Sequence, residues 1–247
     1  ALWNVSADYR PVEGLHVGAG IAQSMRLPTF TDLYYSSPAQ INNLDLTPEH
    51  AITYRLGADY TRSHWHAALQ GYYRAGRDII DWVLREDMDG KWHSEQTNSL
   101  STFGVELSGG YRSEQGFLRS VSLLYAYITT SQDDRLVTKN AMDYMRHKAA
   151  LNVEVHFLRR FSLSLTGAFY DRNGTYAYYP VVGDSSVSEM RSFDPYFLLD
   201  GRLSWEKGIC RLYVDATNIT DTDYCEMGGI RRPGAWVTGG IVLTIGR

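Results

Sequence analysis

The stretch Val214–Tyr224 (VDATNITDTDY) ends one predicted β-strand and begins a long polar loop. Its first four residues continue an alternating strand, whereas Asn218 and Asp221 can hydrogen-bond their own backbone and so favour a turn. Glycines and a proline between 228 and 234 prevent a regular element before the next apolar run, Ala235–Ile245. The stretch therefore predicts a hairpin with a long connection near the C-terminal end of the sequence.

The same alternation of apolar and polar residues recurs upstream. In the clearest case, Ile52–Tyr60, every second residue is apolar and the residues between them are Thr, Arg, Gly and Asp. Period-two alternation is typical of strands with one apolar face. We predict about eleven strands, each long enough to cross a bilayer at a tilt. The predicted fold class is all-β, antiparallel and up-and-down.

Two regularities separate a membrane barrel from a soluble sandwich, which alternation alone would also fit. Short turns, predicted at 11–14, 61–63, 112–116, 158–160 and 207–208, alternate with long polar loops, predicted at 27–48, 78–97, 129–145, 171–195 and 218–234. Aromatic residues flank the short turns on the apolar face: Tyr9, Tyr60, Trp65, Tyr111, Phe117, Phe157, Phe161 and Trp205. Both features are typical of a transmembrane antiparallel β-barrel with interfacial aromatic girdles.

Composition and charge exclude several other classes. No run reaches the roughly 18 apolar residues of a transmembrane helix, and the net charge of -4 is spread over mixed acids and bases, which does not favour nucleic acid. Metal-ligand spacings and phosphate-binding glycine loops are absent from the sequence, so no metal and no cofactor is expected. His64 and His66 flank a short turn, across the membrane from Asp78 and Asp81, so no catalytic group converges and an enzyme is not expected.

The number of predicted strands is odd, which indicates that the chain is one part of a larger barrel. A complete bacterial barrel instead has an even number of strands. The chain is also predicted to begin in an extracellular loop. An open sheet would expose unpaired edges to lipid. We therefore expect residues 1–247 to be the C-terminal part of a barrel whose remaining strands come from another part of the same protein.

Three motifs resemble signatures of the TonB-dependent outer-membrane receptors. They are Met25–Tyr34, Asn42–Glu49, and Asn218–Tyr224 with Glu226, Pro233 and Gly234. The resemblance implies a barrel of about 22 strands closed by an N-terminal plug, of which this sequence would hold the last half. It also implies the partners: the rest of the barrel with its plug, the TonB complex, and the lipid and lipopolysaccharide of the Gram-negative outer membrane. A surface lipoprotein that caps the loops is left open as a further partner.

The motif residues are expected to act structurally. They are Arg26, Pro28, Leu44, Pro48, Glu49, Asn218, Asp221, Tyr224, Pro233 and Gly234. Pro28 and Pro48 cannot donate to a strand ladder and should end it, and Arg26 and Glu49 are placed to form an ion pair at the strand ends.

Ligand contacts are expected from loop aromatic residues and one arginine: Tyr34, Tyr35, Trp82, Trp92, Tyr176, Tyr178, Tyr179 and Arg231. Within the resemblance, the loop sizes and the segment 71–82 are most similar to cobalamin receptors, which implies active import of cobalamin or another corrinoid. A ferric siderophore receptor is the alternative. It would need clustered arginines for an anionic ligand, and Arg172, Arg191, Arg231 and Arg232 are the loop arginines that could supply them. A passive diffusion porin is disfavoured, because porin barrels usually have fewer strands and no plug.

Overall fold

The computed structural model describes residues 2–85, 89–132, 138, 143–178, 180, 189–226 and 229–245. Two compact units are distinguished. Unit 1 comprises residues 1–59, 69–105 and 127–144, and unit 2 comprises residues 60–68, 106–126 and 145–247. Strands β4 to β8 contribute to both units.

The regular elements are almost all strands. In chain order they are β1 (Trp3–Val12), β2 (Leu15–Arg26), α1 (Phe30–Tyr34), β3 (Gln40–Ile41), β4 (Glu49–Arg62), β5 (Trp65–Arg85), β6 (Lys91–Arg112), β7 (Leu118–Gln132), β8 (Tyr144–Phe157), β9 (Phe161–Asn173), β10 (Thr175–Tyr178), β11 (Glu189–Ser192), β12 (Tyr196–Lys207), β13 (Cys210–Thr217) and β14 (Trp236–Leu243). Among the described residues, no helix is long and apolar enough to cross a membrane.

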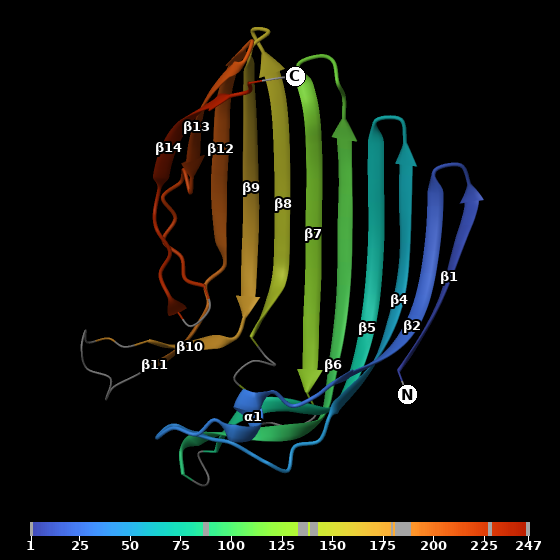
Figure 1. Ribbon diagram of the computed structural model, residues 1–247, viewed down its shortest axis with the longest axis vertical. Coiled ribbons are helices and arrows are strands. Elements are labelled where there is room, and N and C mark those ends of the chain that lie inside the picture. The colour runs from blue at the N-terminus through green and yellow to red at the C-terminus, as the bar shows by residue number, and fades with distance from the viewer. Residues whose placement is uncertain are drawn as a thin grey trace. The chain divides into compact units, whose positions relative to one another are not determined.

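Eleven strands of the described chain form one hydrogen-bonded path in the order β1-β2-β4-β5-β6-β7-β8-β9-β12-β13-β14 (Figure 1). Strand β3 adds to β6 in parallel, and β10 pairs with β11 as a separate two-stranded sheet. The pairs β1–β2, β9–β12, β12–β13 and β13–β14 are antiparallel. The predicted up-and-down sheet of about eleven strands is confirmed.

The five predicted short turns are also confirmed, and each contains a residue with positive φ. Gly14 has φ 82° and Gly208 has φ 60°, a left-handed backbone that glycine adopts without steric cost. The other short turns use Ser63, Gly116, Leu158 and Arg159 at positive φ. These local signals are enough to place the strand ends.

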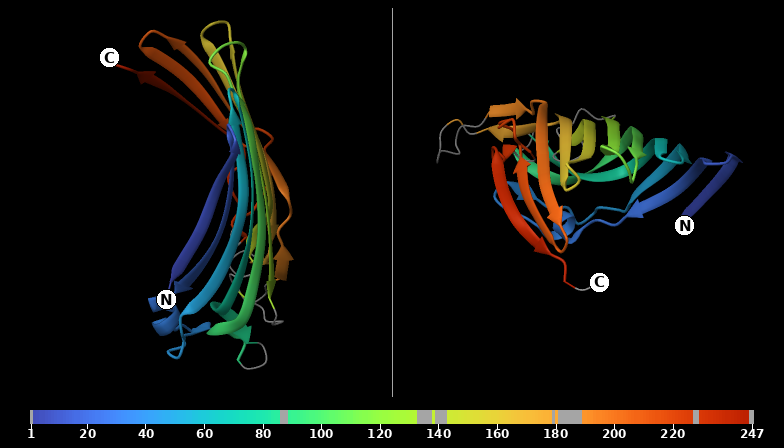
Figure 2. Two further views of the ribbon diagram at one scale, coloured as in Figure 1. Left: turned by 90° about the vertical axis from the view of Figure 1, so that its right-hand side faces the viewer. Right: turned by 90° about the horizontal axis from the view of Figure 1, so that it is seen from above.

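The loop predicted at 78–97 is wrong. β5 continues to Arg85 and β6 begins at Lys91, so both strands run far past the neighbouring strand ends. The reason is a small core in unit 1: Ile79, Ile80, Trp82 and Val83 are all buried, Val83 at 0% exposure. Helix α1 lies at the same end of the strands as the β5–β6 extension in Figure 1 and in the left view of Figure 2.

The loop predicted at 171–195 also contains regular structure. β9 continues to Asn173, and β10 and β11 form an antiparallel pair in which Tyr176 lies opposite Arg191. The loop predicted at 27–48 has the predicted bounds, because β2 ends at Arg26 and β4 begins at Glu49, and it too contains regular structure, namely α1 and β3.

The apolar face of the sheet is exposed. Leu56, Trp65 and Ile241 are 64%, 63% and 68% exposed, and most large apolar side chains of the described strands are at least partly accessible. Near the short turns, the rings of Trp65 and Tyr111 lie 4.9 Å apart between centroids, and those of Phe157 and Phe161 5.6 Å apart. A soluble sandwich would bury such a face, whereas a membrane sheet presents it to lipid.

The opposite face is polar, and cross-strand pairs join its charges. Arg202 lies directly opposite Asp215, and its Nη2 donates to Asp215 Oδ2 at 2.7 Å. Glu206 lies opposite Arg211, with 2.7 Å between Arg211 Nη2 and Glu206 Oε2. Both pairs are at least partly exposed to solvent, so they contribute little to stability and mainly define which face is polar.

Glycine at 240 makes room for an aromatic ring. A Cβ at Gly240 would lie 2.5 Å from Tyr213 Oη and 2.6 Å from Cζ. We expect Gly240→Ala to lower the free energy of unfolding by about 1–2 kcal/mol, because the ring must leave its place. Gly239→Ala is the matched control, since its Cβ would meet no atom closer than 3.4 Å. Denaturant titration of the complete receptor in detergent measures both; equal effects of the two substitutions would contradict the steric explanation.

Candidate functional site

Arg26 and Glu49 form the expected ion pair, at the ends of β2 and β4. Glu49 is 5% exposed, and its Oε1 also accepts a hydrogen bond from the Ile80 N–H of β5 at 2.8 Å. The Arg26 guanidinium donates to the Ile80 carbonyl at 3.3 Å and lies 3.5 Å from Asp32 Oδ2. One buried carboxylate and one guanidinium thus tie three strands and α1 together.

The loop between β2 and β4 is held by local caps. Thr29 and Asp32 form a capping box at α1, with Asp32 N–H donating to Thr29 Oγ1 at 3.1 Å and Thr29 N–H donating to Asp32 Oδ2 at 2.9 Å. Pro28 lies between the end of β2 and this cap, and Pro48 directly precedes β4. Leu44 is 65% exposed. The two prolines therefore stand where the ladder ends.

Four predicted ligand contacts belong to unit 1. Tyr34 and Tyr35 are 57% and 48% exposed, and the Tyr34 ring lies 4.7 Å from that of Phe30. Trp92 is partly exposed, and its backbone N–H donates to the Ala39 carbonyl at 3.0 Å. Trp82 is only 6% exposed, within the core of the β5–β6 extension. This burial gives Trp82 a packing role, whereas Tyr34 and Tyr35 remain accessible to a ligand.

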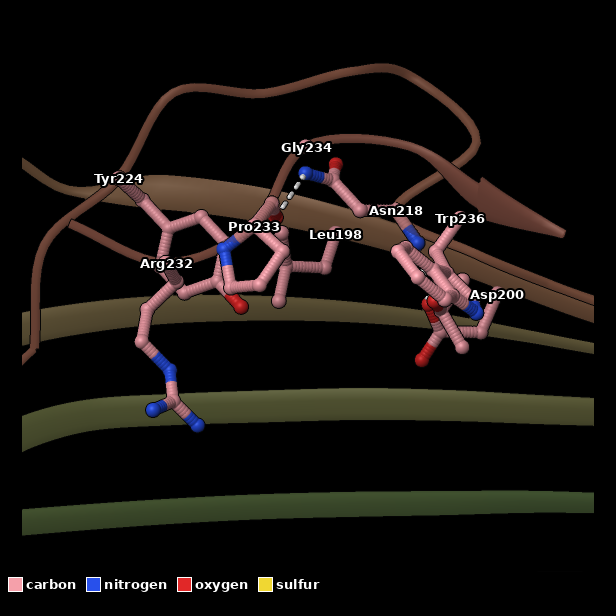
Figure 3. Close-up of a pocket in the computed structure, with 9 residues that line it drawn as sticks. Leu198, Asp200, Asn218, Tyr224, Arg232, Pro233, Gly234 and Trp236 are labelled. Carbon is pink, nitrogen blue, oxygen red and sulfur yellow. Dashed lines mark hydrogen bonds between the residues drawn. The ribbon is translucent and has the colours of Figure 1, made fainter.

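In unit 2, Asn218 holds the loop between β13 and β14. It is 4% exposed with φ 48°. Its N–H donates to Asp200 Oδ1 at 2.8 Å, its Nδ2 donates to the Thr222 carbonyl at 2.9 Å, and its Oδ1 accepts from Thr222 N–H at 2.9 Å. Figure 3 shows the longer bond, 3.5 Å, from Asn218 Nδ2 to the Pro233 carbonyl. Every polar atom of this side chain is used to fix the loop.

Asp221 completes the same loop. It has φ 50°, and its Oδ1 accepts a hydrogen bond from Ala235 N–H at 2.8 Å. A Cβ at Gly234 would lie 2.3 Å from that Oδ1, so the loop requires glycine there. The motif residues Asn218, Asp221, Pro233 and Gly234 are thus brought into one hydrogen-bonded turn.

This turn borders a cavity of about 400 Å³, which we call the wall pocket. It is lined by Leu198, Asp200, Thr217, Asn218, Tyr224, Arg232, Pro233, Gly234 and Trp236. In Figure 3 the guanidinium of Arg232 lies at one side of the group, and Asp200 and Trp236 lie at the other. The wall pocket therefore carries one acid and one base across its width.

A second cavity in unit 2, of about 360 Å³, brings together three predicted ligand contacts: Tyr176, Tyr178 and Arg231. We call it the loop pocket. Its other lining residues are Arg191, Phe193, Asp194, Pro195, Tyr196, Asp223, Tyr224, Cys225 and Gly229. Tyr179, the remaining predicted contact in this region, lies outside the described residues. The pocket is built by the β10–β11 pair, the start of β12 and the loop after β13.

Stacked side chains shape the loop pocket. The Arg191 guanidinium lies 3.6 Å from the centroid of the Tyr178 ring, a cation–π contact. The rings of Tyr176 and Phe193 lie 5.0 Å apart, and Phe193 is 7% exposed. Gly229, with φ 70°, passes so close to Tyr176 that a Cβ would lie 2.1 Å from the ring. Sequence reasoning missed Phe193, because its neighbours come from distant segments.

The charges of the loop pocket are balanced. Arg191 and Arg231 are offset by Asp194 and Asp223 in the lining. Arg231 Nη2 lies 3.2 Å from Asp223 Oδ2. The hydrogen bond that Arg191 donates to Glu189, at 3.0 Å, raises the pKa of its guanidinium, so Arg191 stays cationic. The arrangement suits a ligand with aromatic or amide surface better than one with a concentrated negative charge.

Comparison with known proteins decides the family. A family model described as "TonB dependent receptor-like, beta-barrel" matches residues 1–219. The chain belongs to the TonB-dependent receptor family. These receptors are β-barrels of the outer membrane of Gram-negative bacteria, and they are transporters, not enzymes. In such barrels the apolar strand face contacts lipid and the polar face lines the interior.

One similar curated protein is the vitamin B12 transporter BtuB of Photobacterium profundum. It is 24% identical to this TonB-dependent receptor chain over 111 residues, which is 44% of this chain and 18% of that protein. The matched region is therefore less than a fifth of the length of that relative.

Similar solved structures come from several receptors. The copper transporter OprC has a TM-score of 0.74 at 16% identity. The match covers 97% of this chain and 39% of OprC. The FrpB iron transporter from Neisseria meningitidis has a TM-score of 0.69 at 12% identity, with 96% and 38% covered. A mutant ferric enterobactin receptor (PfeA) from Pseudomonas aeruginosa, in complex with enterobactin, has 0.70 at 16%, with 98% and 40% covered. These likenesses show the fold, and this chain spans about two-fifths of those receptors.

Proposed function

We propose that this chain is the C-terminal part of the barrel of an active importer that takes up cobalamin or another corrinoid and is energised by TonB. Its partners are then the rest of the barrel with an N-terminal plug, the TonB complex, and lipopolysaccharide around the loops. Ligand binds at the extracellular loops, and force from TonB on the plug opens a path along the polar face.

The observation that carries the corrinoid assignment is the loop pocket. Tyr176, Tyr178 and Phe193 contribute aromatic rings to its lining, while its two arginines are matched by two aspartates. A corrinoid is a large, partly apolar ring with amide side chains, and tyrosine supplies both apolar contact area and hydroxyl groups to such a ligand. Similarity to a vitamin B12 transporter, at 24% identity over 111 residues, supports the same class.

Ferric siderophore import is the second candidate. The observation in its favour is the set of loop cations, since Arg191 and Arg231 both line the loop pocket. A ferric catecholate carries several negative charges and requires cations in excess of acids. Because Asp223 already pairs with Arg231, the excess is absent from the described lining, and the corrinoid is preferred.

Calorimetry on the complete receptor in detergent separates the two. We expect cyanocobalamin to bind tightly and ferric enterobactin to bind weakly or not at all. Binding of the ferric siderophore alone would reject the corrinoid and leave the importer class in place. Binding of neither probe, with a surface lipoprotein also supplied, would reject both assignments.

The loop pocket makes its own prediction. Tyr178→Ala should weaken cyanocobalamin binding by about tenfold, because it removes an aromatic contact and frees Arg191 from its stacking partner. Tyr9→Ala is the control, since Tyr9 lies on β1 and is 68% exposed on the apolar face. The dissociation constant from calorimetry is the readout. A Tyr178→Ala receptor that binds as tightly as the unsubstituted one would place the ligand elsewhere.

A further inference from the structure

Three tyrosine rings form a stacked column in unit 2. The rings of Tyr170 and Tyr196 lie 5.0 Å apart with an interplanar angle of 25°, and those of Tyr196 and Tyr224 lie 4.6 Å apart at 29°. The Lys148 ammonium group lies 5.8 Å from the centroid of the Tyr170 ring. The column thus runs from the loop after β13, over β12 and β9, to a cation on β8.

The register of the sheet places this column on the polar face. Tyr196 lies directly opposite Tyr170, and in the same pairing Asp200 lies opposite Thr166 and Arg202 opposite Ser164. Because side chains alternate between faces, Tyr196 shares its face with Asp200 and Arg202. In a barrel of this family that face lines the interior, where a transported ligand passes.

The column borders both the wall pocket and the loop pocket. Tyr196 and Tyr224 line the loop pocket, and Tyr224 also lines the wall pocket beside Asp200. Tyr170 and Lys148 lie beyond either cavity, farther along the column. Because Tyr170 lies directly opposite Tyr196, the column runs across the strands at one level of the wall, so Tyr170 and Lys148 extend it from the loop pocket onto the polar face of β9 and β8.

The stacking determines which groups of the three tyrosines a ligand can reach. Each ring covers the face of its neighbour, so the faces are used within the column, and the ring edges with their phenol groups remain for a ligand. All three rings are partly exposed. Phenylalanine would stack equally well, so the hydroxyl groups are the feature that packing alone does not require. A row of hydroxyl donors that ends in an ammonium group suits hydrogen-bond acceptors such as amide carbonyls and phosphate oxygens.

We propose that Tyr170, Tyr196, Tyr224 and Lys148 form a second ligand site on the barrel wall, which receives the acceptor groups of the ligand after it leaves the loop pocket. This inference rests on the proposed import function. The column acts on translocation, whereas the loop pocket determines the affinity measured from outside.

The test compares binding and uptake in the complete receptor, with the probe that the unsubstituted receptor binds, cyanocobalamin or ferric enterobactin. Tyr170→Phe keeps the stack and removes one hydroxyl group. We expect its uptake rate in cells to fall about fivefold, with the dissociation constant changed by less than about twofold. Lys148→Gln should slow uptake similarly, and Lys148→Arg should restore it because the charge is kept. Tyr213→Phe, a tyrosine of β13 outside the column, is the matched control and should transport normally.

Several outcomes would overturn the second site. Uptake by Tyr170→Phe equal to that of the unsubstituted receptor, or a fall matched by Tyr213→Phe, would reduce the column to packing. Equal losses of affinity and uptake would make Tyr170 part of the first site. Binding of ferric enterobactin in place of cyanocobalamin rejects the corrinoid assignment alone, since the column is then tested with that probe. Binding of neither rejects both proposals.

Discussion

Glu49→Ala should lower the free energy of unfolding by about 3 kcal/mol, the largest effect that we expect from a single change in unit 1. The side chain of Glu49 is 6% exposed, and its carboxylate serves both Arg26 and the Ile80 N–H. Removing it leaves the Ile80 N–H without its acceptor, and it leaves Arg26 with the Ile80 carbonyl and the more distant Asp32 carboxylate as partners. The Arg26 side chain is 43% exposed, so water compensates part of the loss and keeps the cost near the lower end for buried pairs.

Denaturant titration of the complete receptor, reconstituted in lipid, measures this cost. Glu49→Gln should be milder, because an amide oxygen can still accept from Ile80. The double variant Arg26→Gln with Glu49→Gln should be more stable than Glu49→Ala, since the Ile80 N–H keeps an acceptor and Asp32 keeps the hydrogen bond from the Thr29 N–H. Asp215→Asn, which breaks the partly exposed pair with Arg202, is the control and should leave the midpoint unchanged. A Glu49→Ala midpoint equal to that control would mean that the network does not stabilise the fold.

Asn218→Ala should lower the free energy of unfolding by about 3 kcal/mol, the second large effect that we expect. It removes the two short side-chain hydrogen bonds to Thr222 and places alanine at φ 48°, where a Cβ without polar compensation is disfavoured. The loop after β13 should loosen with it, because Asn218 also reaches Pro233.

Two variants separate the causes. Asn218→Gly relieves the backbone and should recover part of the loss, whereas Asn218→Asp keeps the acceptor for Thr222 N–H and loses the donor. Thr220→Ala, at an exposed hydroxyl pair in the same loop, is the matched control. Hydrogen exchange of the loop, followed by mass spectrometry, reads the local effect. Protection unchanged in Asn218→Ala would show that the backbone alone holds the turn.

The strands and turns could be predicted because their signals are local. Alternation in Ile52–Tyr60 and glycines such as Gly14 and Gly208 depend on neighbouring residues only, and the structure has the strands and turns where those signals placed them. The ion pair of Arg26 and Glu49 was also predicted, since both residues stand at strand ends that adjoin in an up-and-down sheet.

The β5–β6 extension was not predicted, although Ile79, Ile80, Trp82 and Val83 are apolar, because the segments that pair with it lie far away in the sequence. What keeps β5 extended past residue 78 is contact with segments far away in sequence: Gln40 and Ile41 of β3 pair with β6, and Gln96 donates to the Thr47 carbonyl at 2.7 Å. The burial of Trp82 follows from the same contacts.

The candidate site was predicted in part. Tyr176, Tyr178 and Arg231 were selected as loop residues, and the structure brings them to one pocket. Tyr196 and Asp223 were not selected, because nothing in their local sequence reveals that β12 and the last loop meet β10 and β11. Whether any of these residues contacts a ligand stays a prediction until binding is measured.

The lengths of β5 and β6 have a consequence outside the membrane. These strands have 21 and 22 residues, and a tilted strand needs only about nine to eleven to cross the hydrocarbon. About ten residues of each therefore remain, and at about 3.3 Å per residue they reach as much as roughly 30 Å beyond the bilayer. The hairpin therefore needs a core of its own outside the lipid, which Ile80, Trp82 and Val83 supply.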